Sequence, residues 1–285
     1  MPGNGLPLLL RSFGLTTMAG MWEETLARAG QEHWGYERLI RHLCESEAQD
    51  RRERRSQRLL KAARLPDGKT LANLNEQLLP AKIRRLLPTL LEGHFVERAE
   101  NILAFGLPGR GKTHFLAAVG RELVLRQDVP VLFTPTFKLV QQLLTAKKEL
   151  RLESRLKELD RYPVVILDDL GYVQQNREEM EVLFTFLAER YERRTVMISS
   201  NLVFSKWDQI FKDPMTTMAA IDRLVHHALI LEFDGESVRA QKAQEREGRP
   251  GAPVSPLGST TSLAPGGAKD SVPPKGLTQK KKQEG

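Results

Sequence analysis

The chain has 285 residues, 40% of them hydrophobic, which is enough for one sizeable core or for one core with a small appendage. A formal net charge of +7 favours polyanionic partners such as nucleic acid or an anionic membrane surface, or else it only keeps the protein soluble. The single cysteine, Cys44, excludes an internal disulfide, and no apolar run approaches the roughly 20 residues that span a bilayer. We therefore expect a soluble, cytoplasmic protein without a membrane segment.

The first hundred residues are predicted to be mainly helical. Residues 1–20 contain several Gly and Pro residues and are expected to be irregular. Residues 21–65 are predicted to be helix and contain the charged run DRRERRSQRLLKAAR. A second helical segment, with apolar residues at helical spacing, is bounded by Pro80 and Gly93, where helix breakers belong.

From residue 101 short apolar runs alternate with longer helical segments. The expected strands are Ile102–Phe105, Val131–Thr134, Val164–Leu167, Thr195–Ser199 and Leu229–Phe233. The expected helices are Lys112–Gln127, Phe137–Leu159, Arg177–Tyr191 and one around Met218–His227. Strands that alternate with helices predict an α/β fold, with a five-stranded parallel sheet covered on both faces.

The end of the chain has a different composition. No aromatic residue follows Phe233, and from about residue 246 the sequence consists mainly of Pro, Gly, Ser and Lys and ends in QKKKQEG. Such a segment cannot bury enough apolar surface to order itself, so residues 246–285 are predicted to be a disordered tail.

A phosphate-binding loop is predicted between the first strand and the helix that follows it. The segment ILAFGLPGRGKTHFLAAVG fits the pattern G-x-x-x-x-G-K-[ST]. Its glycines let backbone N–H groups turn inward around phosphates, and the helix N-terminus adds partial positive charge. Lys112 is expected to reach the β- and γ-phosphates of ATP, and the Thr113 hydroxyl to bind Mg²⁺. The predicted nucleotide-binding residues are Gly106, Leu107, Pro108, Gly109, Arg110, Gly111, Lys112 and Thr113.

Two later strands end in polar residues that would complete the site. YPVVILDDLG places Asp168 to hold Mg²⁺ and Asp169 to orient the attacking water, although an acidic pair could also only cap the next turn. RRTVMISSN would place Asn201 beside Asp169, where it could hold the water or a γ-phosphate oxygen. Read alone, SSN could equally be a turn or a helix cap.

Two arginines and two histidines near the last strand complete the set of candidates. Arg223 lies on a helix before that strand and Arg239 lies after it, and either could stabilise transition-state charge at the γ-phosphate. Most arginines, however, are solvated surface groups. His226 and His227 are adjacent, have no partner set nearby in the sequence, and are expected to be structural.

Four segments together resemble a known family. They are GLPGRGKTHFLAAVG, VVILDDLGYV, ISSNLVFSKWDQIFKDP and AAIDRLVHHALILEF. Over roughly residues 20–245 the chain resembles the IstB-type ATP-binding proteins of bacterial insertion sequences, which are similar to the DnaC helicase loaders and belong to the AAA+ class. The resemblance implies Walker A at Gly106–Thr113, Walker B at Asp168–Asp169 and sensor 1 at Asn201. It also implies a trans-acting arginine finger at Arg223 and a sensor 2 arginine at Arg239.

The resemblance also suggests a domain division. It comprises an irregular N-terminus over residues 1–20, a helical accessory domain over 21–75, an AAA+ ATPase domain over 76–245 and the tail over 246–285. One departure from the family pattern concerns hydrolysis: Asp169 stands where AAA+ proteins often carry Glu, and the shorter side chain predicts slow turnover.

The function implied by the resemblance is that of a helper in transposition. Such a protein assembles on double-stranded DNA as an ATP-dependent oligomer and assists a separate transposase. The alternatives are a DnaC-like replicative helicase loader and a metabolic P-loop kinase, although nothing in the sequence signals the acceptor pocket that a kinase needs. A basic run could track a DNA backbone or could be a solvated helix face. The run consists of Arg51, Arg52, Arg54, Arg55, Arg58, Lys61 and Arg64.

Overall fold

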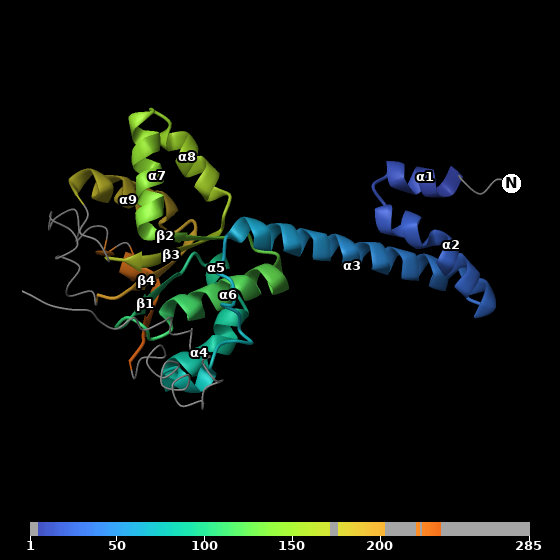
Figure 1. Ribbon diagram of the computed structural model, residues 1–285, viewed down its shortest axis with the longest axis horizontal. Helices are drawn as coiled ribbons and strands as arrows, with labels where there is room; N and C mark the ends of the chain where they lie inside the picture. Colours follow the sequence, from blue (N-terminus) through green and yellow to red (C-terminus); the bar gives the residue numbers. More distant parts are fainter. Residues whose placement is uncertain (1–4, 172–175, 203–220, 223, 235–285) are drawn as a thin grey trace, which may run out of the picture. The chain divides into compact units, whose positions relative to one another are not determined.

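The computed structural model describes residues 5–171, 176–202, 221–222 and 224–234 (Figure 1). Five strands in this part of the chain form one parallel sheet in the order β2-β3-β4-β1-β5. The strands are β1 (Asn101–Phe105), β2 (Val131–Pro135), β3 (Val164–Leu170), β4 (Thr195–Ser200) and β5 (Ala228–Glu232). β1 lies between β4 and β5, and β3 lies between β2 and β4, so the carboxyl ends of β1, β3 and β4 are neighbours at one edge of the sheet.

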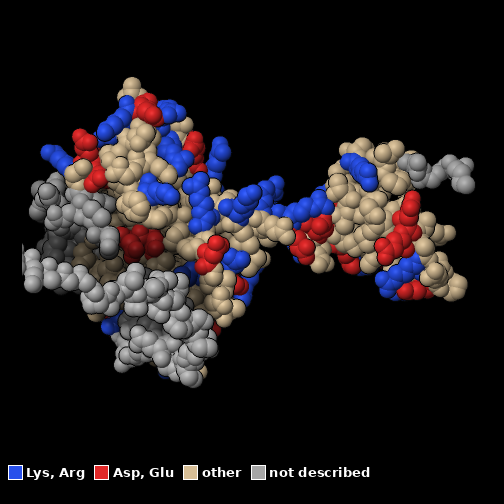
Figure 2. Space-filling view, in the orientation of Figure 1, with Lys and Arg blue, Asp and Glu red and all other residues tan. Residues whose placement is uncertain are grey.

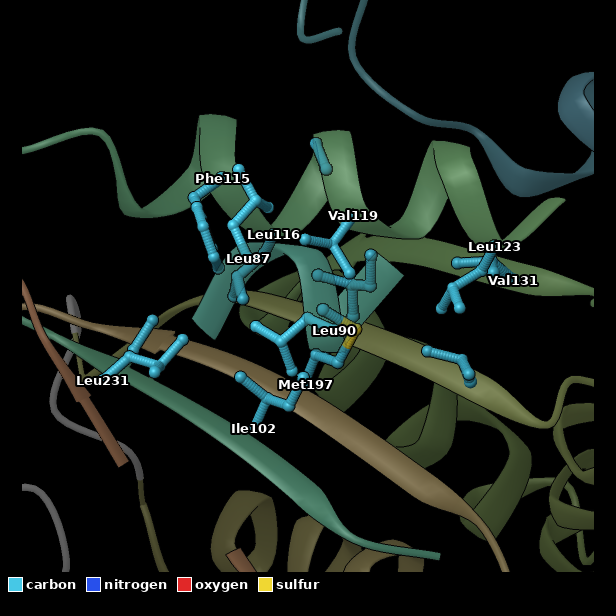
Figure 3. Close-up of a cluster of buried hydrophobic side chains, with 14 of the residues drawn as sticks. Leu87, Leu90, Ile102, Phe115, Leu116, Val119, Leu123, Val131, Met197 and Leu231 are labelled. Atoms are coloured by element: carbon cyan, nitrogen blue, oxygen red, sulfur yellow. The ribbon is translucent and has the colours of Figure 1, made fainter. Parts of the chain in front are cut away.

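Helices cover both faces of the sheet because alternate strand residues point to opposite sides. One face packs on α4 (Ala81–Leu91) and α6 (Lys112–Gln127), and Figure 3 shows this cluster, in which Phe115 and Leu116 of α6 lie above Ile102 of β1. The other face packs on three helices. They are α7 (Thr136–Lys148), α8 (Leu152–Asp160) and α9 (Arg177–Arg190). The structure confirms the predicted α/β fold, with a five-stranded parallel sheet between two helical layers.

The predicted strands are confirmed to within about three residues, and two of the predicted helices, Lys112–Gln127 and Arg177–Tyr191, to within one. The helix expected around Met218–His227 lies largely outside the described residues. One expectation was wrong. The segment 137–159 was expected to be one helix, but the structure has α7 and α8 separated by Glu149–Arg151, with Leu150 in the left-handed region at φ 56°. Neither Gly nor Pro marks this break in the sequence. The break lets Leu143 of α7 and Leu159 of α8 pack in the same cluster against the sheet, so tertiary packing determines where the helix ends.

The N-terminal segment contains three helices. They are α1 (Gly5–Ser12), α2 (Thr16–Gln31) and α3 (Tyr36–Ala63). The prediction of an irregular segment over residues 1–20 was therefore wrong, and the expected continuous helix over 21–65 is interrupted before Tyr36, with His33 at φ 50°. A contact distant in sequence fixes the start of α2: the buried carboxylate of Glu47 accepts hydrogen bonds from the backbone N–H groups of Thr17 (2.8 Å) and Met18 (3.1 Å).

The end of α3 belongs to the hydrophobic cluster on the α4 and α6 side of the sheet. Ala63 is fully buried in the same cluster as Ile83 of α4, and Leu59, Leu60 and Leu65 pack against that cluster. The division proposed between residues 75 and 76 therefore falls inside one continuous set of apolar contacts. The proposed tail, residues 246–285, lies outside the described residues. Among the described helices, none combines the length and the apolar character that a bilayer crossing requires.

Candidate nucleotide-binding site

The Walker A loop joins β1 to α6 and depends on glycine at three positions. Gly106, Gly109 and Gly111 have φ values of 146°, 84° and 90°, which residues with a Cβ rarely adopt. Gly106 is also required by space, because a Cβ there would lie 2.5 Å from the carbonyl oxygen of Phe233, just after β5. The backbone N–H of Phe233 in turn donates to the carbonyl oxygen of Phe105 at 2.7 Å. The residue after β5 is therefore held directly against the start of the loop.

Lys112 is held at the start of α6 by oxygen atoms. Its side chain is only 5% exposed, and its Nζ donates to the carbonyl oxygens of Gly106 (2.6 Å) and Leu107 (3.0 Å) and to Oδ1 of Asn201 (2.8 Å). A buried ammonium group needs such partners because it has left water. The structure thus brings Asn201, at the end of β4, directly to Lys112.

Thr113 and Asp168 form the second part of the site. The Thr113 hydroxyl donates to Oδ1 of Asp168 at 2.8 Å, and the Ser199 hydroxyl donates to the same oxygen at 2.6 Å. Burial raises the pKa of the Asp168 carboxyl and outweighs the hydrogen bonds from Ser199 and Thr113, while nearby Asp169 raises it further and Lys112 lowers it. A hydroxyl and a carboxylate at this spacing are the oxygen ligands that suit Mg²⁺.

Asp169 lies near the end of β3, where the pairing of β3 with β4 is irregular. The pairing of these strands shifts register between Leu167 and Leu170, and Asp169 has a left-handed φ of 57°, which Asp tolerates better than most residues. Its backbone N–H donates to the Ser199 hydroxyl at 2.9 Å, and its side chain is exposed. The carboxylate of Asp169 therefore points away from the core while its backbone is fixed.

Two hydroxyl residues at the site were not predicted to act there. Ser199 contacts both Walker B residues, and the buried Thr136 donates to the carbonyl oxygen of Asp168 at 2.9 Å. The segment SSN was recognised as polar, but the sequence alone did not show which serine faces β3. The strand pairing supplies this, since Ser199 lies one residue beyond Ile198, the partner of Leu167.

The other predicted residues lie in the loop or outside the described part of the chain. Leu107 is 61% exposed and lies in the loop with Pro108 and Arg110. Arg223 and Arg239 lie outside the described residues.

Comparison with known proteins agrees with this geometry. Residues 9–246 match the family described as IstB-like ATP binding protein. The chain belongs to this family.

Among curated relatives, this IstB-like chain is 40% identical over 241 residues to an insertion-sequence ATP-binding protein of Sinorhizobium fredii, covering 84% of this chain and 80% of that protein. It is 35% identical over 240 residues to the IS21 insertion-sequence ATP-binding protein of Pseudomonas aeruginosa, covering 84% and 90%. Among solved structures, the replication initiator DnaA bound to AMPPCP and single-stranded DNA superposes with a TM-score of 0.51 at 18% identity, covering 64% of this chain and 55% of DnaA. This last likeness concerns the fold alone.

Proposed function

We propose that this IstB-like protein hydrolyses ATP in the presence of Mg²⁺ and uses the two nucleotide states to switch its own assembly on double-stranded DNA. On that DNA, in the cytoplasm, it assists a separate transposase and carries out no strand transfer itself. The observation that carries the proposal is the 2.8 Å hydrogen bond between the Thr113 hydroxyl and the Asp168 carboxylate. Thr113 directly follows Lys112, whose ammonium group is held by a carbonyl oxygen of the glycine loop. The relatives' association with insertion sequences supports the transposition context.

The chain's own residues divide the chemistry of hydrolysis. When bound, ATP with Mg²⁺ supplies the phosphoanhydride bond and a cation that neutralises its charge. Thr113 and Asp168 would hold the cation, and Lys112 would exchange its carbonyl partners for phosphate oxygens. Asp169 would orient a water molecule and accept its proton, since its carboxylate is exposed while its backbone is fixed. Asn201 would position that water or the γ-phosphate.

Arginines from outside the described residues complete the proposal. Arg223 would act on the site of a neighbouring subunit, and Arg239 would contact the nucleotide of its own subunit. A positive charge at the γ-phosphate stabilises the charge that develops in the transition state. Assembly and hydrolysis are then coupled, because each site is complete only at a subunit interface.

The structure refines which cations of α3 could bind DNA. Figure 2 shows Lys and Arg side chains gathered along this helix. Arg54 donates to the hydroxyls of Thr16 and Thr17, and Arg51 donates to the carbonyl of Gly14, so both arginines hold α2 in place. Arg55 lies 3.9 Å from the Asp128 carboxylate. Arg52, Arg58 and Lys61 are exposed on the same helix and are the better candidates for phosphate contacts.

A DNA-binding variant tests this surface. Replacing Arg52, Arg58 and Lys61 together by Gln should weaken duplex binding equally for all sequences and reduce the slope of log affinity against log salt by roughly three. The matched control is Arg54→Gln on the same helix, which should change stability and leave the salt slope unaltered. If the slope of log affinity against log salt is unchanged in the triple variant, these cations do not contact DNA and only form a solvated helix face.

The central experiment measures phosphate release with and without duplex DNA. We expect duplex DNA to stimulate turnover, and a non-hydrolysable ATP analogue to trap DNA-bound oligomers visible by electron microscopy. Lys112→Ala should lose both nucleotide binding and assembly.

Asp169→Asn should bind ATP and assemble but should not hydrolyse ATP. Equal turnover by this variant and the native chain would show that Asp169 does not position the attacking water. A helicase loader would share these residues but would assemble on a helicase instead of duplex DNA.

A further inference from the structure

Two histidines and a glutamate gather at the amino end of the sheet, away from the nucleotide site. Glu192 follows α9, and His226 and His227 come directly before β5. One ligand atom from each of the three side chains lies within 4.8 Å of the others. The sequence predicted no partners for the two histidines, because the glutamate lies more than thirty residues upstream; the fold supplies them.

Hydrogen bonds already orient the cluster. His227 Nε2 lies 3.2 Å from Oε1 of Glu192, and the Tyr191 hydroxyl lies 3.1 Å from Nδ1 of His226. The two imidazole rings are 4.3 Å apart, edge to face at 75°. A residue that holds one ring nitrogen of a histidine fixes which way the other points, as happens at histidine metal sites.

Buried contacts anchor both segments that carry the cluster. Next to Tyr191, the buried guanidinium of Arg190 donates to the carbonyl oxygens of Tyr162 (2.8 Å) and Thr195 (3.0 Å). Next to His226, the backbone N–H of Asn101 donates to the carbonyl of His227 at 2.7 Å. The backbones are therefore fixed, and only exposed side chains need to rotate.

We propose that Glu192, His226 and His227 bind one divalent transition-metal ion, with Zn²⁺ the best match. Imidazole nitrogen with a carboxylate oxygen suits zinc, nickel or copper, whereas Mg²⁺ prefers oxygen ligands throughout. Bonds of about 2.0–2.1 Å place the ligand atoms of a tetrahedral zinc roughly 3.3 Å apart, so side-chain rotation must close the cluster by on the order of 1 Å. Water completes the coordination because the site is exposed.

The surrounding charges permit a cation here. Arg193 and Arg194 follow Glu192, but both lie within salt-bridge distance of the Asp160 carboxylate, at 3.5 and 3.3 Å. His227 also interacts electrostatically with the carboxylate of Glu100, which forms a salt bridge with Arg98 at 2.8 Å. The site therefore offers two imidazole ligands and one carboxylate ligand, with a further carboxylate nearby.

Metal binding at this position would join the end of α9 to the segment that leads into the edge strand β5. β5 pairs with β1 along its whole length, and Phe233, the residue after β5, lies against Gly106 of the Walker A loop. A bound ion should therefore stabilise the edge of the sheet on which the nucleotide loop rests. This role does not depend on ATP hydrolysis.

The test uses the full-length, tag-free protein without nucleotide and Zn²⁺ alone as the probe. Calorimetry should give one site per chain, and Co²⁺ in place of zinc should give the visible absorption of a tetrahedral or five-coordinate centre. His226→Ala, His227→Ala and Glu192→Gln should each weaken Zn²⁺ binding by more than about tenfold. In the native chain, saturating Zn²⁺ should raise the melting temperature and slow amide exchange in residues 228–232.

The matched control is His94→Ala. His94 is also exposed and has a glutamate partner, Glu97, at 3.7 Å, but it is not part of the cluster; its loss should leave zinc binding unchanged. Equal binding by the native chain and His226→Ala would overturn the proposal. So would loss of the site in Asp168→Asn with retention in His227→Ala, because the ion would then lie at the nucleotide site.

Discussion

Ser199 joins the two Walker B residues through one hydroxyl, which donates to the Asp168 carboxylate and accepts from the Asp169 backbone N–H. We expect Ser199→Ala to reduce turnover by roughly tenfold or more while ATP binding is largely kept, because Asp168, the proposed Mg²⁺ ligand, loses a hydrogen-bond partner. Leaving the Asp169 N–H without its acceptor should also cost on the order of 1–3 kcal/mol of stability. Steady-state kinetics and thermal unfolding would measure both.

The pH profile separates this role from a merely structural one. The Ser199 hydrogen bond lowers the pKa of the Asp168 carboxyl against the raising effect of burial. Its removal should move the acidic limb of the turnover profile to higher pH, since Asp168 must be ionised to bind a cation. Ser200→Ala is the control: its hydroxyl donates to the carbonyl of Leu170 at 2.9 Å and does not touch Asp168, so the limb should stay in place.

Gly106 allows no side chain. Gly106→Ala would place a Cβ 2.5 Å from the Phe233 carbonyl oxygen at a φ of 146°. We expect a loss of about 2 kcal/mol or more in the free energy of unfolding, together with loss of ATP binding. Gly20→Ala is the contrasting variant, because Gly20 lies within α2 with no atom near its missing Cβ and should gain roughly 0.5–1 kcal/mol. Comparable nucleotide affinity in Gly106→Ala and the native chain would contradict the geometry of the loop.

At the scale of elements, Glu47 of α3 serves as the acceptor for the start of α2. Burial raises the pKa of this carboxyl, but hydrogen bonds from the Met18 N–H, Arg51 and the Thr17 N–H outweigh it and hold the pKa below its usual value. The stabilisation is therefore complete above the unfolded pKa, about 4.3, and is lost as pH falls through the lower folded value.

This pH dependence can be measured without altering any residue of the nucleotide-binding site. Amide exchange at Thr17 and Met18, corrected for its intrinsic pH dependence, should lose protection below about pH 4. Glu47→Gln should show weaker protection already at neutral pH and no further loss on acidification. If the native chain and Glu47→Gln respond to acid in the same way, Glu47 is not the group that fixes α2.

The core elements could be predicted because buried parallel strands are continuous apolar runs, as in VVIL of β3 and ILAF of β1. The break at Leu150 could not, because no Gly or Pro marks it and it follows from the packing of Leu143 and Leu159 in one cluster. Helix α1 could not, because the Gly and Pro residues around it indicated an irregular segment. The site residues also differ in whether the sequence alone could identify them. Lys112, Thr113 and Asp168 belong to motifs, whereas the part of Ser199 follows from the pairing of β4 with β3.

At the scale of the whole molecule, the proposal requires a site shared between subunits. Arg223→Ala should bind ATP almost normally as a monomer but should neither hydrolyse it nor form DNA-bound oligomers. Mixing Arg223→Ala with Lys112→Ala should restore part of the ATPase activity, because the second variant donates an intact arginine to the intact loop of the first. If the two proteins co-assemble without regaining activity, Arg223 does not act in trans, and Arg239 becomes the better candidate.

The contact between Gly106 and Phe233 also has a consequence for how the protein is made. A ribosome completes the glycine loop about 120 residues before it adds Phe233, the residue whose carbonyl oxygen lies against Gly106 of that loop. At about 5–20 residues per second, this interval lasts on the order of ten seconds. During that time the nascent chain carries the whole Walker A sequence but lacks one side of its pocket. We therefore expect the nascent chain to bind ATP only after Phe233 has been added and has left the ribosome.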